Sequence, residues 1–169
     1  MLRVYLDNDI ASAISRRQTA MAAVDHLLNL KQLGTIVLDT SRQSTREMER
    51  APVQYQQGLK SGLHDLGIAP DDHVVLGSNI AADQLVGGCI CYPLVTDIVD
   101  EALYSTLVEE GLKADDAKHF MYAVHNHYDR FVTWDRNFLN RRGTLGSCCG
   151  TIQIQTPEEL VSELLHASD

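Results

Sequence analysis

Short apolar runs alternate with longer stretches of helical periodicity along the chain. A bounded apolar run of about four to eight residues is typical of a buried strand, and apolar positions about three and four residues apart are typical of a helix. The runs predict strands at 2–6, 35–38, 74–76, 131–134 and 151–154. The periodic stretches predict helices at 10–34, 41–50, 53–66 and 96–110, one that begins at Asp115 or Asp116, and one that opens at Thr156.

Strands that alternate with helices predict an α/β protein, with a parallel sheet covered on both faces. Residues at the boundaries agree with this division: Gly34 suits a helix C-terminus, Pro52 closes a helix, and Thr156 with Pro157 opens one. Behind Asp116, the residues Phe120, Ala123, Val124 and His127 repeat at helical spacing and are candidates for a buried face. The 169 residues predict a single domain, 1–169, with a less readable insertion around 52–93.

The composition is that of an ordinary globular protein, with an apolar content of 44%. No stretch approaches the roughly 20 apolar residues that span a bilayer, and the N-terminus lacks the long apolar core of a signal peptide. We therefore expect a cytoplasmic protein without membrane contact. The four cysteines form the pairs Cys89-x-Cys91 and Cys148-Cys149, which lack the C-x-x-C spacing of zinc and redox sites. We interpret them as small buried residues, with a zinc knuckle as the alternative.

The formal net charge of −9 argues against a generic nucleic-acid binder, which usually carries a basic face. However, Arg42, Arg46 and Arg50 repeat every four residues and would line one stripe of the predicted helix at 41–50. This stripe is a candidate contact for a nucleic-acid backbone. A solvated helix face with ordinary ion pairs is the alternative.

Four acids are predicted to meet at one edge of the sheet. Asp7 and Asp135 each follow an apolar strand, Glu47 lies just beyond a third strand, and Asp116 begins a helix. The carboxyl ends of parallel strands face one side, so these acids can meet if their strands are neighbours. Crowded carboxylates raise one another's pKa unless a cation lies among them, and oxygen-only ligands select Mg²⁺ or Mn²⁺. The chemistry that fits is metal-dependent hydrolysis of phosphodiesters.

Each of these acids also has a structural interpretation. Asp7 and Asp116 can satisfy helix N-termini, and Asp135 can cap a short helix around 137–139. Ser44-x-x-Glu47 matches a capping box, in which Glu47 does no more than cap its own helix. Only the combination of the four acids points to a metal site.

Three motifs resemble those of PIN domains. They are Tyr5-Leu-Asp7-Asn-Asp9 after the first strand, Asp116-Ala-Lys-His119 at the start of a helix, and Phe131-Val-Thr-Trp-Asp135-x-x-Phe138. The ending from Ile152 to Leu160 is also similar, whereas the region 51–93 carries no match. The resemblance implies a three-layer α/β/α sandwich whose acidic pocket binds Mg²⁺ or Mn²⁺ and cleaves RNA.

The resemblance also assigns roles to single residues. Catalysis and metal binding fall to Asp7, Asp116 and Asp135, with Glu47 as the fourth acid and Glu49 as its competitor for that role. Thr133 is implied as a polar support of the site, and the arginine stripe as the contact with the RNA backbone. Many PIN domains are the toxins of bacterial toxin–antitoxin pairs. The expected partners are therefore an RNA substrate, an antitoxin protein and a second copy in a homodimer.

Two positions depart from the family pattern. Asp9 stands where the family usually has Asn, Ser or Thr, and Asn137 replaces a second acid that many members have after the Asp135 position. Either change can alter the number of metal ions or the activity. His119 matches a histidine that is usually structural in the family. His125 and His127 are expected to be ordinary histidines, because their side chains would point apart on a helix.

Two other functions are compatible with the sequence. Asp7-x-Asp9 after an apolar strand also looks like the first motif of haloacid-dehalogenase-type phosphatases, in which the first Asp is a nucleophile and the second a general acid. Asp115-Asp116 would then serve as the later acidic pair of that family. The other function is that of a PIN-like module that binds a partner, such as a basic antitoxin tail, and cleaves nothing.

Overall fold

The computed structural model describes residues 1–16, 21–50, 52, 53, 56, 66–68, 74–76 and 94–166. Most of the predicted helix at 53–66 and most of the predicted insertion at 52–93, with Cys89 and Cys91, lie outside these residues. No helix in the described ranges is long and apolar enough to cross a membrane.

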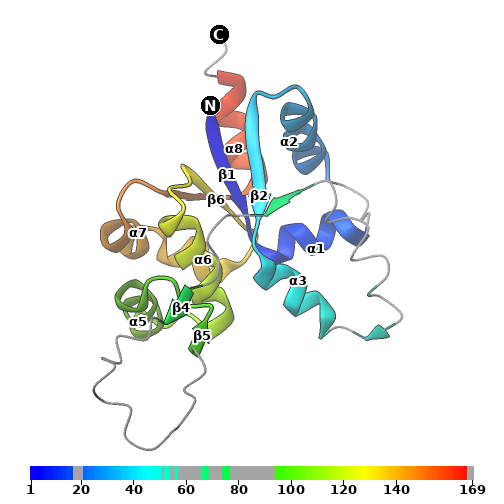
Figure 1. The fold of residues 1–169 in the computed structure, drawn as a ribbon. Helices are drawn as coiled ribbons and strands as arrows, with labels where there is room; N and C mark the ends of the chain where they lie inside the picture. The colour runs from blue at the N-terminus through cyan, green and yellow to red at the C-terminus, as the bar shows by residue number, and fades with distance from the viewer. Residues whose placement is uncertain are drawn as a thin grey trace, which may run out of the picture.

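A parallel sheet forms the centre of the molecule. Its strands are β1 (Leu2–Leu6), β2 (Ile36–Thr40), β3 (Gly67–Ile68), β6 (Arg130–Val132) and β7 (Gln153–Gln155). They lie in the order β3-β2-β1-β6-β7, and all neighbours are parallel. Four strands form the body of the sheet, and β3 adds only 2 residues at one edge. The predicted α/β class with a central parallel sheet is confirmed (Figure 1).

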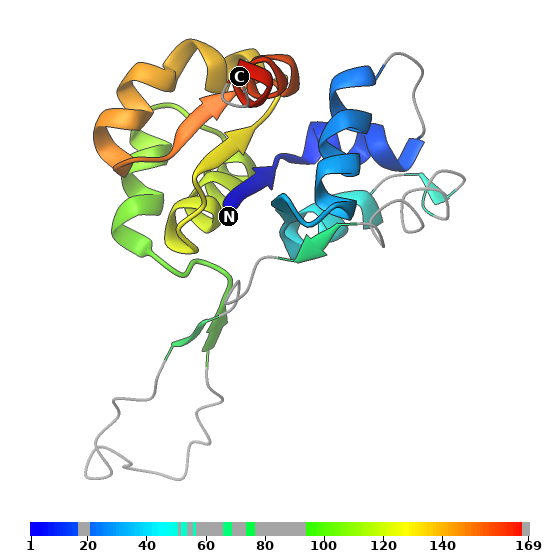
Figure 2. The same cartoon turned by 90° about the horizontal axis from the view of Figure 1, so that it is seen from above.

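Helices cover both faces of this sheet, which gives three layers. One face carries α1 (Asn8–Arg16), α2 (Ala22–Gln32) and α8 (Pro157–His166), and the other carries α5 (Glu101–Glu109), α6 (Ala114–His125) and α7 (Arg136–Cys149). Figure 1 and the view from above in Figure 2 show the sheet between the two groups of helices. A further helix, α3 (Arg42–Glu49), follows the carboxyl end of β2 and contacts both α1 and α6.

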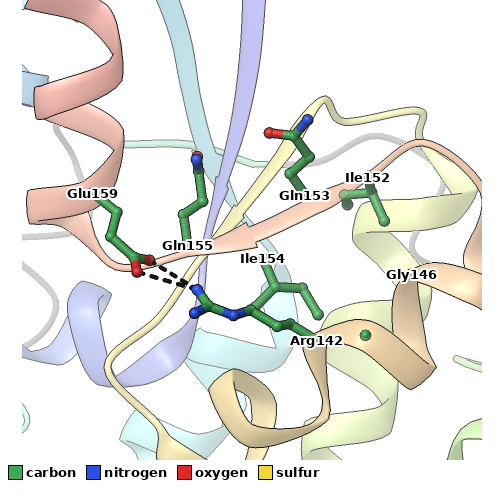
Figure 3. Close-up of a pocket in the computed structure, with 8 residues that line it drawn as sticks. Arg142, Gly146, Ile152, Gln153, Ile154, Gln155 and Glu159 are labelled. Atoms are coloured by element: carbon green, nitrogen blue, oxygen red, sulfur yellow. Dashed lines mark hydrogen bonds and ion pairs between the residues drawn. The ribbon is translucent and has the colours of Figure 1, made fainter.

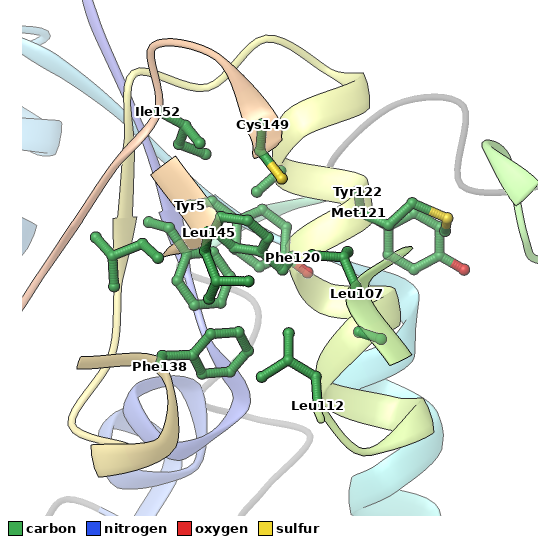
Figure 4. Packing of buried hydrophobic residues seen from close by; sticks show 14 of the residues in the cluster. Tyr5, Leu107, Leu112, Phe120, Met121, Tyr122, Phe138, Leu145, Cys149 and Ile152 are labelled. Atoms are coloured by element: carbon green, nitrogen blue, oxygen red, sulfur yellow. The ribbon is translucent and has the colours of Figure 1, made fainter. Parts of the chain in front are cut away.

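The pleat of β1 divides the hydrophobic core between the two faces. Val4 and Leu6 pack in the cluster with α1, α2 and α8, whereas Tyr5 between them packs in the cluster with α6 and α7. In the second cluster, Tyr5 stacks on Phe131 with ring centroids 5.5 Å apart, and Phe131 meets Phe120 edge-on at 5.0 Å. Figure 4 shows Tyr5 and Phe120 together in this cluster. β1 is therefore buried on both faces over Val4, Tyr5 and Leu6, its consecutive apolar residues.

The prediction of one helix at 10–34 is wrong, because the structure has the two helices α1 and α2 there. A continuous helix over this stretch would be about 37 Å long at about 1.5 Å per residue, whereas β1 spans about 17 Å. Two shorter helices bury Ile14, Val24 and Leu27 in one cluster on the same face of the sheet. Gly34 follows α2 with a φ of +70°, as predicted for the glycine after a helix.

The predicted strand at 74–76 is confirmed as β4 (Val74–Leu76), but it lies outside the central sheet. β4 pairs antiparallel with β5 (Leu94–Thr96) in a separate two-stranded sheet, which Figure 2 shows away from the central strands. The helix predicted at 96–110 is α5, and it begins only at Glu101. Asp100 fixes this start, because its side chain accepts a hydrogen bond of 2.9 Å from Leu103 N.

Other element ends also differ from the apolar runs. β2 extends beyond 38 to Thr40, β6 ends at 132 rather than 134, and β7 occupies 153–155 rather than 151–154. The predicted buried face of α6 is confirmed for Phe120 and Ala123, and Val124 is half-buried. His127 is wrong as a member of this face, because it lies after the helix, exposed, with a φ of +56°.

Candidate functional site

The chain order reverses between β1 and β6. From β1 the chain continues through α1 and α2 to β2 on one side, whereas β6, on the other side of β1, continues through α7 to β7. In open α/β sheets, ligands bind beyond the carboxyl ends of the strands at such a point. Asp7 directly follows β1 and Thr133 directly follows β6. Polar residues therefore border the crevice where a ligand is expected.

Asp7 is buried, with 5% of its surface exposed, and is held from both strands. Its N donates to Val132 O at 3.0 Å, while Thr133 Oγ1 donates to its Oδ2 at 2.8 Å and Asn8 N to its Oδ1 at 2.7 Å. Burial raises the pKa of the Asp7 carboxyl, and the charge of Asp116 raises it further; His119 and the hydrogen bonds from Thr133 and Asn8 act in the opposite direction. Thr133 thus contacts Asp7, as expected for a supporting residue.

Asp9 joins α1 to the loop that follows β6. Its carboxylate accepts hydrogen bonds of 2.8 Å from Trp134 N and 2.6 Å from Ile10 N. Burial, and next the charge of Asp7, raise the pKa of Asp9 to about 7. The acid that departs from the family pattern is therefore engaged with the backbone beside Asp7, and it is only partly ionised at neutral pH.

The interpretation of Glu47 as a helix cap is wrong. α3 begins at Arg42, so Ser41 is the residue before the helix, and its Oγ accepts from Gln43 N at 3.2 Å. Ser44 lies inside the helix, where its hydroxyl is hydrogen-bonded to Thr40 at 2.7 Å. Glu47 instead reaches across to α1 and α6.

Three donors from three elements hold the Glu47 carboxylate. Asn8 Nδ2 donates to Oε2, and Oε1 accepts from His119 Nε2 at 3.1 Å and from Gln43 Nε2 at 3.2 Å. Glu49, the competing acid, is exposed at the end of α3. Of the two, Glu47 is the acid that points toward Asp7 and α6.

His119 connects the core to this acid. It is buried, and its Nδ1 is hydrogen-bonded to the Tyr5 hydroxyl at 2.8 Å while its Nε2 donates to Glu47. Burial alone would lower the pKa of His119, but the hydrogen bond to Glu47 and the charges of Asp7, Glu47 and Asp116 outweigh it and raise the pKa. The surrounding acids thus shift the pKa of His119 upward despite its burial, and His119 positions Glu47.

Asp116 and Asp135 complete the set. Asp116 lies half-buried in the first turn of α6. Burial raises its pKa, and the negative charges of Asp135 and Glu47 raise it further. The positive charges of Lys113 and His119 act in the opposite direction and lower it. Asp135 does not directly follow β6, because that strand ends at 132. It caps α7, accepting 2.8 Å from Asn137 N, and its own N donates to Thr133 Oγ1 at 2.9 Å. The predicted capping role is thus confirmed, for a helix of 14 residues rather than a short one.

The four acids lie at one edge of the sheet, where the charges of Asp135 and Glu47 reach Asp116 and the charge of Asp116 reaches Asp7. However, they do not enclose a metal-binding position. Among the described residues, no three His, Cys, Asp or Glu side chains stand close enough together to hold a metal ion as they are. Glu47 and Asp135 are instead engaged by donors within the protein.

The arginine stripe is largely paired with acids. Arg46 Nη1 lies 2.7 Å from Asp97 Oδ2, and Arg50 Nη1 lies 3.1 Å from Asp115 Oδ2. Arg42 is exposed. The alternative of ordinary ion pairs therefore describes Arg46 and Arg50 in the free protein.

Several residues that contact the acids were not identified from the sequence. Asn8 and Gln43 hold Glu47, and Asp97 receives Arg46. Two of them carry a recognisable signal: Asn8 lies between two acids at a strand end, and Gln43 lies one helical turn before Glu47. Asp97 has no such signal, because it contacts α3 from a segment about fifty residues away in the chain.

The cysteines and the remaining histidines lie apart from this site. Cys149 is buried, and burial raises the pKa of its thiol to about 11, whereas Cys148 is exposed; both are free. The prediction of small buried residues is thus confirmed for Cys149 and wrong for Cys148. His125 and His127 are exposed near the amino end of β6.

Two pockets lie elsewhere in the described part of the molecule. One, of about 530 Å³, is bordered by α7, β7 and the start of α8, with an ion pair of 3.1 Å between Arg142 and Glu159 (Figure 3). The other, of about 670 Å³, lies at the amino ends of β6 and β7 and includes Tyr128 and Cys149. Neither is lined by Asp7, Glu47 or the other two acids. The candidate site is thus identified by its charges and its place in the sheet, and it is separate from these two pockets.

No family model matches the chain, and no curated protein matches it. The structure alone shows the α/β fold with its central parallel sheet, and the PIN domain remains a resemblance of sequence motifs.

Proposed function

We propose that the protein is a PIN-type endoribonuclease that uses Mg²⁺ or Mn²⁺ to hydrolyse phosphodiester bonds of single-stranded RNA. One observation carries the proposal: Asp116 lies near enough to acids of three other elements for their charges to interact at the carboxyl ends of β1 and β6. Besides burial, the charges of Asp135 and Glu47 raise the pKa of Asp116, and the charge of Asp116 raises that of Asp7. Such crowding of like charges is costly to a fold and is typical of a catalytic site.

The donor set fits a hard divalent cation, because all four side chains offer only carboxylate oxygens. Asp7, Asp116 and Asp135 would hold the metal, together with Glu47. A bound metal would supply an activated water and stabilise the charge on the phosphate oxygens. Since no three acids enclose a metal as they stand in the described structure, binding requires their carboxyl groups to turn toward one another. On turning toward a metal, Glu47 would lose its hydrogen bonds with Asn8, Gln43 and His119.

Other side chains would serve the reaction by position and charge. Thr133 fixes the orientation of Asp7 through its hydroxyl, and His119 fixes that of Glu47. Arg42, Arg46 and Arg50 would hold the RNA backbone, for which Arg46 and Arg50 must exchange an internal carboxylate for a phosphate. In the same proposal the protein acts in the cytoplasm, as the toxin of a toxin–antitoxin pair, and forms homodimers.

A phosphatase of the haloacid-dehalogenase type is the second candidate, favoured by one observation. A general acid needs a pKa near the working pH, and the pKa of Asp9 is raised to about 7. However, Asp115 and Asp116 lie in the first turn of α6, not after a strand, which argues against them as the later acidic pair. Loss of phosphomonoesterase activity on Asp9→Asn would favour this candidate over the nuclease.

The experiment that tests the nuclease is cleavage of a labelled single-stranded RNA with Mg²⁺ or Mn²⁺. Asp7→Asn and Asp135→Asn should abolish cleavage, while Asp25→Asn, an exposed acid in the first turn of α2, should leave it unchanged. Circular dichroism verifies that each variant is folded. If both site variants cut as well as the wild type, the activity belongs to a contaminant and the proposal fails. RNA or antitoxin binding without any cleavage would instead support a non-catalytic module.

A further inference from the structure

Two cations from different helices converge on one carboxylate oxygen beside the acids. Arg46 Nη1 of α3 lies 2.7 Å from Asp97 Oδ2, and Lys118 Nζ of α6 lies 2.8 Å from the same oxygen. Burial alone would raise the pKa of Asp97, but the hydrogen bond and charge of Lys118, with the charge of Arg46, hold it below the ordinary value. Asp97 is therefore ionised at neutral pH, and it bridges the two helices.

This bridge borders the acidic site. Arg46 directly precedes Glu47 in α3, and Lys118 lies between Asp116 and His119 in α6. Solvent reaches the bridge, because 37% of the Arg46 side chain, 19% of Lys118 and 22% of Asp97 are exposed. The bridge lies beside the contact of 3.1 Å between His119 and Glu47, which joins the same two helices, so a ligand at Glu47 is close to this pair of cations.

We propose that Arg46 and Lys118 form a binding site for a phosphate of the RNA backbone, and that Asp97 occupies this site in the free protein. The inference rests on the proposed ribonuclease function and adds Lys118 and Asp97 to it. A phosphate oxygen is the same kind of acceptor as a carboxylate oxygen, and both cations bind either one. Asp97 thus stands in the place of the phosphate.

The negative charge of the protein explains why RNA binding would need such a site. The formal net charge is −9, and the acids of the site repel an RNA strand unless cations next to them hold its backbone. The Arg46–Lys118 pair is better suited to hold the backbone than Arg50. The partner of Arg50, Asp115, is more exposed than Asp97 and receives one cation, at 3.1 Å. An RNA strand must first displace Asp97, so Asp97 weakens RNA binding by competition.

The test is RNA binding measured without cleavage. A fluorescently labelled single-stranded oligonucleotide is titrated in EDTA at several salt concentrations and followed by anisotropy. Asp97→Asn keeps both cations but removes the competitor, and it should bind about two- to fivefold more tightly, the range set by exposed ion pairs. Arg46→Gln and Lys118→Gln should each bind more weakly and reduce the slope of log K against log salt by about 0.7.

The matched control is Glu163→Gln. This change also removes one negative charge from a carboxylate paired with an arginine, since Glu163 lies 2.6 Å from Arg130, but on α8, on the other face of the sheet. It should leave RNA binding unchanged, which separates the local effect of Asp97 from a general reduction in negative charge. Inorganic phosphate supplies a second probe: it should raise the melting temperature of Asp97→Asn more than that of Glu163→Gln.

The binding experiment and the nuclease assay separate failure of this inference from failure of the proposed nuclease function. The inference is overturned if Asp97→Asn binds RNA no more tightly than Glu163→Gln, or if the two cation variants bind as well as the wild type. It is also overturned if the wild type binds no RNA. The proposed nuclease fails on its own terms if the wild type binds RNA, with the expected effects of the variants, but does not cleave it with Mg²⁺ or Mn²⁺.

Discussion

Replacing Asp9 by Asn should change how the stability of the metal-free protein depends on pH. The pKa of Asp9 is raised from the ordinary 3.8 to about 7 by burial and by the charge of Asp7. Between about pH 4 and pH 7 the folded protein therefore keeps a proton that the unfolded chain has released. Because the folded state binds more protons, this acid favours folding most below about pH 4, and the benefit is lost as the pH rises through 7.

The size of the effect follows from the same pKa. The difference between 3.8 and about 7 is about three pH units, each worth about 1.4 kcal/mol, so the charge of Asp9 costs at most about 4 kcal/mol above pH 7. Asn carries no charge but has one acceptor oxygen, whereas Asp9 accepts from both Trp134 N and Ile10 N. Losing one of these bonds costs about 1–3 kcal/mol at every pH. Asp9→Asn should be less stable than the wild type near pH 4 and more stable by about 1–3 kcal/mol near pH 8.

Urea unfolding of both proteins in metal-free buffer at about pH 4, 6 and 8, followed by circular dichroism, measures this crossover. The fluorescence of Trp134, the only tryptophan in the sequence, reports on the site itself. Other groups titrate in both proteins, so the difference in free energy of unfolding isolates Asp9 and its coupling to Asp7. A difference that stays constant from pH 4 to pH 8 would refute the reasoning.

Two further perturbations probe the same edge of the sheet. Thr133→Val should lower the free energy of unfolding by about 1–3 kcal/mol, because it removes the donor to buried Asp7 and the acceptor of Asp135 N. Thr133→Ser keeps both hydrogen bonds and serves as the control. Equal losses of stability in the two variants would contradict this account. Mn²⁺ at about a hundred times its Kd should stabilise the wild type by about 2.7 kcal/mol, seen as a higher melting temperature in calorimetry. Asp116→Asn should lose most of this gain, and an undiminished gain would exclude Asp116 as a ligand.

Local sequence signals succeed where the partner of a residue is nearby in the chain. The start of α8 is an example: Thr156 Oγ1 accepts from Glu159 N at 3.2 Å, and Glu159 accepts in return from Thr156 N at 3.0 Å. Both halves of this capping box lie within one turn. The apolar runs likewise predict β1 within its observed limits.

The capping-box pattern misleads at Ser44 and Glu47, because distant contacts set the end of β2. Thr40 Oγ1 donates to Leu6 O at 3.0 Å, and the Tyr128 hydroxyl donates to Asp39 at 2.7 Å. These bonds let two polar residues continue the strand beyond its apolar run to Thr40, so Ser41 directly precedes α3 and Ser44 lies inside the helix. The partners lie far away in the sequence, so a single sequence does not reveal them.

The reversal of strand order around β1 has a consequence for synthesis of the protein. Asp7 and Glu47 belong to the first third of the chain, whereas Asp116 and Asp135 belong to the last third, and β6 completes the crevice only after most residues have been made. A nascent chain carries only Asp7 and Glu47 of the four acids until α6 and β6 have been made. Products truncated before β6 should lack the proposed activity, so the proposed nuclease would become active only after β6 has been synthesised.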